Sequence, residues 1–221
     1  MIPTVVLDRV QTPMGELRLA RRGDEFSIRV AGVELMNSRN HASEDEFGRL
    51  AGALVAGVAT PRVLIGGLGM GFTLRAALDA LGDRARVDVV ELVPAVVRWN
   101  RELYGHLAGA PLGDSRVHVI EADVVAVVRE STARYDAIVL DVDNGPDGIS
   151  EANGRLYGAR GLAELHAALA PGGALAIWSA FEAPAFTKRV TKAGFGVEVR
   201  RVRTQHGGNP VHFFWVARRR G

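Results

Sequence analysis

The stretch that decides the fold is Val63-Leu64-Ile65-Gly66-Gly67-Leu68-Gly69-Met70-Gly71-Phe72-Thr73. Its first residues form a short apolar run, which is typical of a buried strand, and its last residues begin a helical pattern. Glycine permits the positive φ angles of a tight turn. It also lets backbone amides approach a ligand at a helix N-terminus. A glycine-rich turn alone is a weak signal, because many α/β proteins use such turns for purely structural reasons.

Strand and helix patterns alternate on both sides of this turn. We expect strands at 62–65, 86–90, 117–120, 137–140 and 174–178, and helices at 73–81, 94–103, 124–130, 162–169 and 184–193. Continuous apolar strands that alternate with helices predict a parallel sheet covered on both faces. Two last strands, 197–202 and 211–216, suit an antiparallel pair at one edge. The fold class is therefore α/β, with a Rossmann-like, seven-stranded, mostly parallel sheet and helices on both faces.

The first forty residues have a different pattern. Short alternating pieces at 4–7, 16–19 and 26–30 are separated by turn signals, which predicts a small N-terminal antiparallel β sheet. From Ser43 the apolar residues recur at helical spacing, and Ser43 with Glu46 matches a capping box. We therefore expect a small β domain over 1–42 and a Rossmann-like domain over 43–221.

Three acids follow strands of the predicted parallel sheet. Glu91 comes twenty residues after Gly71, at a spacing where a carboxylate can accept both ribose hydroxyls of a nucleotide. Asp123 follows the third strand and can accept from the exocyclic amine of adenine. Asp141 follows the fourth. Ligands of such sheets bind outside the carboxyl ends of the strands. A nicotinamide cofactor fits the same order, but only one nucleotide-binding half is evident.

Composition limits the other classes of function. The 221 residues contain 48% hydrophobic residues and no cysteine, which excludes disulfides, thiolate zinc sites and a cysteine nucleophile. The histidines lack metal-ligand spacing, so we expect no metal site. Late arginines could contact nucleic acid, but a solvated strand face is the simpler interpretation and we do not expect a nucleic-acid partner. No signal-peptide pattern or membrane-spanning run is present, so we expect a cytoplasmic protein without a membrane partner.

The chain resembles the spermidine synthase family within the S-adenosylmethionine-dependent methyltransferase fold. The residues that show this are the small N-terminal sheet, Gly66–Gly71, Val90-Glu91-Leu92, Glu121-Ala122-Asp123, Tyr135–Asp141, the Asp141–Pro146 segment, Leu156-Tyr157 and Leu169–Gly173. The resemblance implies a transferase that uses S-adenosylmethionine, or its decarboxylated form, and an amine acceptor. It also suggests a homodimer.

The resemblance implies roles for individual residues. The donor would be bound by Gly66, Gly67, Gly69, Gly71, Glu91, Leu92, Asp123 and Asp141, with Glu91 on the ribose and Asp123 on the adenine. Asp141 would be the catalytic acid that accepts a proton or charge from the attacking amine. The acceptor pocket would contain Glu44, Asp143, Asn144 and Tyr157. His41-Ala42-Ser43-Glu44 loosely resembles the tyrosine-histidine-glutamate segment of the family, although the tyrosine is missing.

Two departures from the family pattern leave the reaction open. Aminopropyl-transferring members carry an acid where Gly69 stands, and that acid would bind the primary amine of the donor and repel a carboxylate. Gly69 therefore slightly favours methyl transfer, as in the related putrescine N-methyltransferases. Asn144 replaces the second acid of the family's Asp-x-x-Asp-Pro pattern, which argues against a dicationic acceptor. The alternatives are a true aminopropyltransferase that makes a polyamine and a catalytically silent nucleotide-binding homologue.

The three tryptophans are interpreted as core residues. Trp178 follows the fifth strand of the parallel sheet, near the ligand edge, so a place at the border of the pocket is a second interpretation for it.

Overall fold

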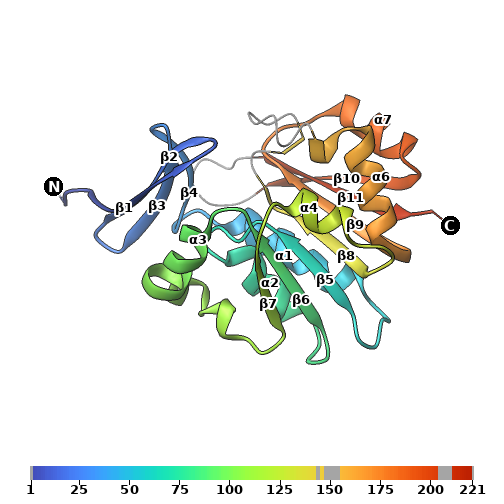
Figure 1. Ribbon diagram of the computed structural model, residues 1–221, viewed down its shortest axis with the longest axis horizontal. Coiled ribbons are helices and arrows are strands. Elements are labelled where there is room, and N and C mark those ends of the chain that lie inside the picture. Colours follow the sequence, from blue (N-terminus) through green and yellow to red (C-terminus); the bar gives the residue numbers. More distant parts are fainter. Residues whose placement is uncertain (1, 143–144, 147–154, 204–210, 221) are drawn as a thin grey trace.

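A small antiparallel sheet forms the N-terminal part of the protein. The computed structural model describes residues 2–142, 145–146, 155–203 and 211–220. The small sheet has the order β1-β2-β3-β4, and Figure 1 shows it at one side of the molecule. Its strands are β1 (Val5–Thr12), β2 (Gly15–Arg22), β3 (Glu25–Val30) and β4 (Val33–Asn37). The predicted small sheet is confirmed, and β4 adds a strand after the turn at residues 31–32.

The larger sheet has seven strands in the order β10-β11-β9-β8-β5-β6-β7. They are β5 (Arg62–Gly66), β6 (Arg86–Glu91), β7 (Val117–Glu121), β8 (Tyr135–Leu140), β9 (Leu169–Ser179), β10 (Phe195–Arg203) and β11 (Val211–Arg219). The first five pair in parallel, whereas β11 pairs antiparallel with both β9 and β10. The predicted Rossmann-like sheet with an antiparallel edge pair is confirmed. One difference is that β9 begins at Leu169, before the expected strand.

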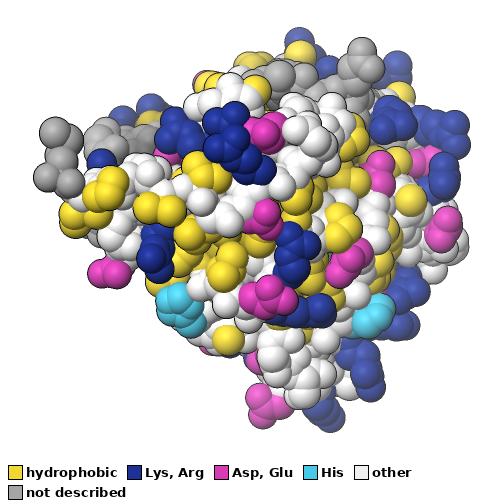
Figure 2. Space-filling model, turned by 60° about the vertical axis from the view of Figure 1, so that its left-hand side comes forward, with side chains coloured by type: hydrophobic (Ala, Val, Ile, Leu, Met, Phe, Trp, Pro, Cys, Tyr) yellow, Lys and Arg dark blue, Asp and Glu magenta, His cyan; other side chains and the backbone are white. Residues whose placement is uncertain are grey.

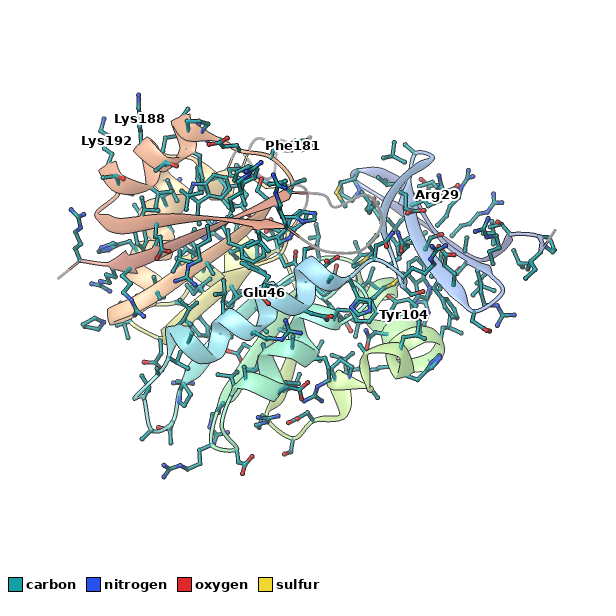
Figure 3. The ribbon with its side chains drawn as sticks, turned by 180° about the vertical axis from the view of Figure 1, so that it is seen from behind. Arg29, Glu46, Tyr104, Phe181, Lys188 and Lys192 are labelled. Atoms are coloured by element: carbon teal, nitrogen blue, oxygen red, sulfur yellow. The ribbon has the colours of Figure 1, made fainter. Side chains whose placement is uncertain are left out.

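Helices cover both faces of the larger sheet, as the continuous apolar strands predicted. One face packs against α1 (Ala42–Leu54), α2 (Phe72–Ala80) and α3 (Pro94–Trp99), and the other against α4 (Val124–Arg129), α6 (Ala159–Ala168) and α7 (Pro184–Lys192). Successive residues of β5 alternate between the two cores: Val63 and Ile65 join the first, and Leu64 joins the second. Figure 1 shows α4 and α6 in front of the sheet, and the reverse view of Figure 3 brings α1 forward.

The beginning of α1 differs from the sequence prediction. His41 is the N-cap residue, and its side chain makes no capping hydrogen bond. The Ser43 hydroxyl donates to its neighbour Glu44 at 2.5 Å, and Glu46 pairs with Arg49 on the exposed surface. The predicted Ser43–Glu46 capping box is therefore wrong, because the helix begins one residue before Ser43.

The small sheet is held against the segment that follows β6. Asp8 of β1 accepts hydrogen bonds at 2.7 Å from the indole of Trp99 and from the guanidinium of Arg98, and these bonds lower the pKa of Asp8. After α3 the chain makes a π-helical turn (Asn100–Tyr104) and two 3-10 turns (Gly105–Ala108 and Pro111–Gly113). The ring of Tyr104 lies edge-on to Phe26 of β3, with centroids 6.1 Å apart (Figure 3). These contacts place the small sheet beside the carboxyl ends of β5 and β6.

Close contact between α1 and α2 depends on a glycine. A Cβ atom at Gly48 would overlap the carbonyl oxygen of Thr73 and lie 2.7 Å from the Cβ of Ala76. We predict that Gly48→Ala lowers the free energy of unfolding by about 2 kcal/mol, because the helices must move apart. Chemical denaturation measures this, with Gly82→Ala as the control, since nothing lies within 4 Å of a Cβ there. Equal stability of the two variants would contradict the prediction.

Candidate functional site

A pocket of about 380 Å³ lies at the carboxyl ends of the parallel strands, where the small sheet meets the larger one. Figure 2 shows hydrophobic side chains gathered on this face, with acidic side chains among them. The glycine turn, the acids that end strands, the start of α1 and the small sheet all contribute to the pocket wall. The edge predicted from the sequence to bind a ligand is thus the edge that is hollowed.

The glycine turn has the backbone that only glycine adopts easily. Gly67 has φ +89° and Gly69 has φ +49°, and both line the pocket. A Cβ at Gly67 would also overlap the carbonyl oxygen of Asp141. Gly66 and Gly71 do not line the pocket: Gly66 packs inward, and Gly71 is the N-cap of α2. Two of the four predicted glycines, Gly66 and Gly71, therefore affect the conformation of the turn without facing the pocket.

Glu91 ends β6 and joins the turn to the strand. Its Oε2 accepts the amide of Leu68 and its Oε1 accepts the amide of Val93, both at 2.9 Å. Only 8% of the residue is exposed, and burial raises the pKa of its carboxyl while these amides act in the opposite direction. The backbone amides of Gly69 and Leu92 act on this pKa in the same direction as the amides of Leu68 and Val93. Glu91 lines the pocket beside the exposed side chain of Leu92, and its ribose role stays a prediction.

Asp123 lies at the next strand end. It is the N-cap residue of α4, and its Oδ1 accepts the amide of Val125 at 2.9 Å. Asp123 and Ala122 both line the pocket, next to Glu91 of the neighbouring strand. A carboxylate that caps a helix with one oxygen keeps acceptor capacity on the other. This position is compatible with the predicted adenine contact.

Asp141 and Glu44 form an acid pair at the end of β8. The Thr73 hydroxyl donates to Oδ2 of Asp141 at 2.5 Å and also lies 3.4 Å from the backbone oxygen of Glu44. Burial and the nearby charge of Glu44 raise the pKa of Asp141 to about 7, although the bond from Thr73 lowers it. Burial also raises the pKa of Glu44. The pair can therefore hold or accept a proton near neutral pH.

The other predicted acceptor residues have different positions. Tyr157 does not line the pocket; it is 1% exposed and packs edge-on against Phe186 of α7, and its neighbours Arg155 and Leu156 are the lining residues. Asp143 and Asn144 lie outside the described residues. Trp178 lines the pocket, so the interpretation of this tryptophan as core alone is wrong.

The sequence analysis missed the contribution of β4. The sulfur and Cε atoms of Met36 both lie 2.8 Å from the position that a Cβ of Gly69 would take. Met36 therefore fills the place beside the turn where the family pattern has an acid. Its position follows from how the two sheets meet, and no local motif signals it.

The described residues contain no group of three or more histidine, aspartate or glutamate side chains placed to hold a metal ion. Within the same residues, no helix is long and apolar enough to cross a membrane.

The Thr73 hydroxyl should control the protonation of Asp141. We predict that Thr73→Val raises the pKa of Asp141 above about 7, because the ionised carboxylate loses its hydrogen-bond donor. A carbon-13 NMR titration of the aspartate carboxyls measures the shift, with Thr191→Val on the exposed face of α7 as the control. An unchanged or lower pKa in Thr73→Val would contradict the arrangement.

Comparisons with known proteins agree with this fold. Residues 53–193 match the family model described as spermine/spermidine synthase domain. The chain is 36% identical over 141 residues to polyamine aminopropyltransferase 1 of Streptomyces coelicolor, covering 60% of this chain and 26% of that protein. It is 30% identical over 168 residues to the polyamine aminopropyltransferase of Mycobacterium tuberculosis, covering 73% of this chain and 30% of the relative. The chain thus spans less than a third of the length of these two relatives.

Two solved structures have the same fold. A spermidine synthase in complex with the transition state analogue AdoDATO superposes with a TM-score of 0.78, covering 97% of this chain and 74% of that one. The spermidine synthase of Thermotoga maritima has a TM-score of 0.75 and covers 97% of this chain and 73% of its own. Both are 18% identical to the chain, so they support the fold alone. The family match covers most of the chain, and the protein therefore belongs to the spermine/spermidine synthase family.

Proposed function

We propose that the protein transfers an aminopropyl group from decarboxylated S-adenosylmethionine to an amine acceptor. The observation that supports this most directly is that Asp141 and Glu44 share one pocket with the glycine turn, Glu91 and Asp123. Family membership and the names of the relatives also favour aminopropyl transfer. In this proposal the acids after β6 and β7 bind the nucleoside, and the acid pair binds the amine.

The proposed reaction is a direct displacement in which the protein forms no covalent bond to either substrate. The amine must be neutral to attack: its lone pair forms the new N–C bond while the C–S bond breaks, and the sulfur leaves as a neutral thioether. Asp141 orients the amine, offsets the positive charge that develops on nitrogen and accepts the proton that the product ammonium loses. With a pKa of about 7, Asp141 is substantially ionised at neutral pH and can act as this base. The pocket supplies alignment for in-line displacement.

Methyl transfer from S-adenosylmethionine is a second candidate. The presence of Gly69 where the family pattern has an acid favours it. The uncharged thioether of Met36 occupies the space that the acid side chain would take. A thioether does not repel the carboxylate of the intact methionine tail, whereas an acid would. The relatives are named as aminopropyltransferases and give methyl transfer no specific support. The methyl preference of the sequence analysis therefore becomes the second choice.

Three other expectations stay predictions. A homodimer and a cytoplasmic location follow from the resemblance and from the sequence pattern. A role in nucleic-acid modification is not favoured, since Arg200 of β10 pairs with Glu198 at 2.9 Å on an exposed strand face. A silent homologue is one outcome of the experiments below.

Donor identity is tested by isothermal titration with both donors. We predict that decarboxylated S-adenosylmethionine binds more tightly than S-adenosylmethionine by about ten-fold, since a methionine carboxylate would lie beside the uncharged Met36 in a pocket whose described lining has four acids and one cation, Arg155. The variant Glu91→Gln should weaken both donors, because its amide nitrogen cannot accept a backbone amide. Tighter binding of S-adenosylmethionine would favour the methyl candidate and contradict this choice.

The role of Asp141 is tested by Asp141→Asn. We predict that this variant lowers kcat about 100-fold or more, since the amide cannot accept the proton. In the wild type, kcat should rise with pH through about 7 as Asp141 ionises, and the variant should lack that rise. Steady-state kinetics across pH measures both effects, with the exposed Asp83→Asn as the control. Unchanged kcat in Asp141→Asn would rule out the assigned role. Tight donor binding without product from the wild type would indicate a silent homologue.

A further inference from the structure

Trp178 lies beside Asp141 at the carboxyl edge of the larger sheet. Strands β8 and β9 pair in parallel with Leu140 opposite Ile177, so Asp141 and Trp178 are the next neighbours along the two strands. Leu140 and Ile177 both belong to the core on the side of α6. Because successive side chains of a strand alternate between faces, Asp141 and Trp178 lie on the opposite face, which α1 covers. Trp178 packs against the core of that face.

The second acid of the pair lies on this same face. Glu44 belongs to the first turn of α1, and its charge acts on Asp141 across the gap between the helix and the sheet. Glu44, Asp141 and Trp178 all line the pocket. Two carboxyl groups and one indole ring therefore border the same end of the pocket, the end that the proposed function assigns to the amine.

The pocket meets the carbon atoms of this indole ring. The Nε1 atom of Trp178 is buried and has no hydrogen-bond partner among the described residues, so it is not presented to a ligand. His212 of β11 packs against the ring, with the two ring centroids 5.2 Å apart and the two planes 33° apart. Burial lowers the pKa of His212, so its imidazole is mainly neutral at neutral pH and does not repel a cation beside the indole.

An aromatic face beside two carboxylates is an arrangement that binds cations. The face of an indole carries negative charge density and attracts an ammonium that lies within about 6 Å of the ring centre. This attraction is stronger where the cation is removed from water. In the proposed reaction the acceptor nitrogen changes from a neutral amine to an ammonium as the N–C bond forms. Its attraction to the ring therefore increases towards the transition state, which is the condition for accelerating the reaction.

We propose that Trp178 binds the acceptor nitrogen, with the indole face opposite His212 against the nitrogen and the acid pair Asp141 and Glu44 beside it. This inference rests on the proposed function, because it assumes that the acid pair binds the attacking amine. It adds an uncharged residue that contacts the reacting atom and stabilises the positive charge that forms there. An aliphatic side chain at the same position would supply only an apolar wall.

The test lowers the charge density of the ring and nearly keeps its shape. Site-specific incorporation replaces Trp178 in the full chain by tryptophans that carry one, two and three ring fluorines, each of which weakens the attraction for a cation. The probe amines are 1,4-diaminobutane and 1-aminopentane, and isothermal titration measures their Kd with methylthioadenosine bound. We expect the Kd to rise with each fluorine, by about ten-fold over the series. The control is the same series at Trp215, which is 1% exposed and does not line the pocket.

Two substitutions give a second measurement. Trp178→Phe keeps an aromatic face, whereas Trp178→Leu keeps an apolar side chain without one. With decarboxylated S-adenosylmethionine at saturation, we expect kcat/KM for the amine to be about ten-fold lower in Trp178→Leu than in Trp178→Phe. The thermal midpoint of each variant shows whether it has folded, and the fluorinated proteins provide the test if Trp178→Leu does not fold.

The outcomes separate this inference from the proposed function. An amine Kd that is independent of fluorination, or an equal effect at Trp215, would overturn the inference and leave the proposed function intact. Weaker binding of S-adenosylmethionine, with unchanged binding of S-adenosylhomocysteine and of both amines, would also overturn it, because the ring would then bind the sulfonium. A Kd that rises with fluorination in a protein that makes no product would support the role of Trp178 and contradict the proposed transfer. A wild type that binds neither amine would overturn both.

Discussion

The site depends on the two hydrogen bonds that the Glu91 carboxylate accepts from the backbone. The amides of Leu68 and Val93 hold one carboxylate oxygen each, so the glycine turn is tied to the end of β6. Burying the carboxylate without these amides would cost free energy, because its oxygens would lack hydrogen-bond donors. Without this anchor, the glycine turn could adopt many other backbone conformations. The Tyr104 hydroxyl also approaches the turn, 3.2 Å from the backbone oxygen of Gly69. The turn is thus bonded both to Glu91 of β6 and to Tyr104 of the segment after α3.

The small sheet has two roles that use the same residues. Leu17 and Ile28 belong to the hydrophobic core that continues into α3, and they also line the pocket. One layer of apolar side chains can serve both purposes because the pocket opens where the two sheets meet. Asp8, bonded to Arg98 and Trp99, fixes the sheet from its outer strand. The shape of the pocket therefore depends on contacts made far from any ligand.

Local patterns predicted most of the fold and part of the site. Continuous apolar strands that alternate with helices specify a parallel sheet, and a parallel sheet brings every strand end to one edge, which is why Glu91, Asp123 and Asp141 share a pocket. Contacts between distant segments could not be read in this way. The sequence predicts Tyr157 in the acceptor pocket, yet its side chain packs against Phe186 of α7 in the core. Met36 reaches Gly69 only because two sheets meet there, and Ser43 lies two residues after the N-cap position, which His41 takes.

The acid pair is hard to explain by stability. In the folded protein the pKa of Asp141 is raised from 3.8 to about 7, so between these values the folded state binds a proton that the unfolded state has lost. Stability therefore falls as pH rises through this window, and the ionised carboxylate is disfavoured in the fold. A cationic ligand beside the pair reverses this effect, since it favours ionisation and must release a proton when it binds. A pocket with two such acids is thus suited to a positively charged donor and to an amine that loses a proton. Without a cationic ligand, ionisation of these acids lowers the stability of the fold.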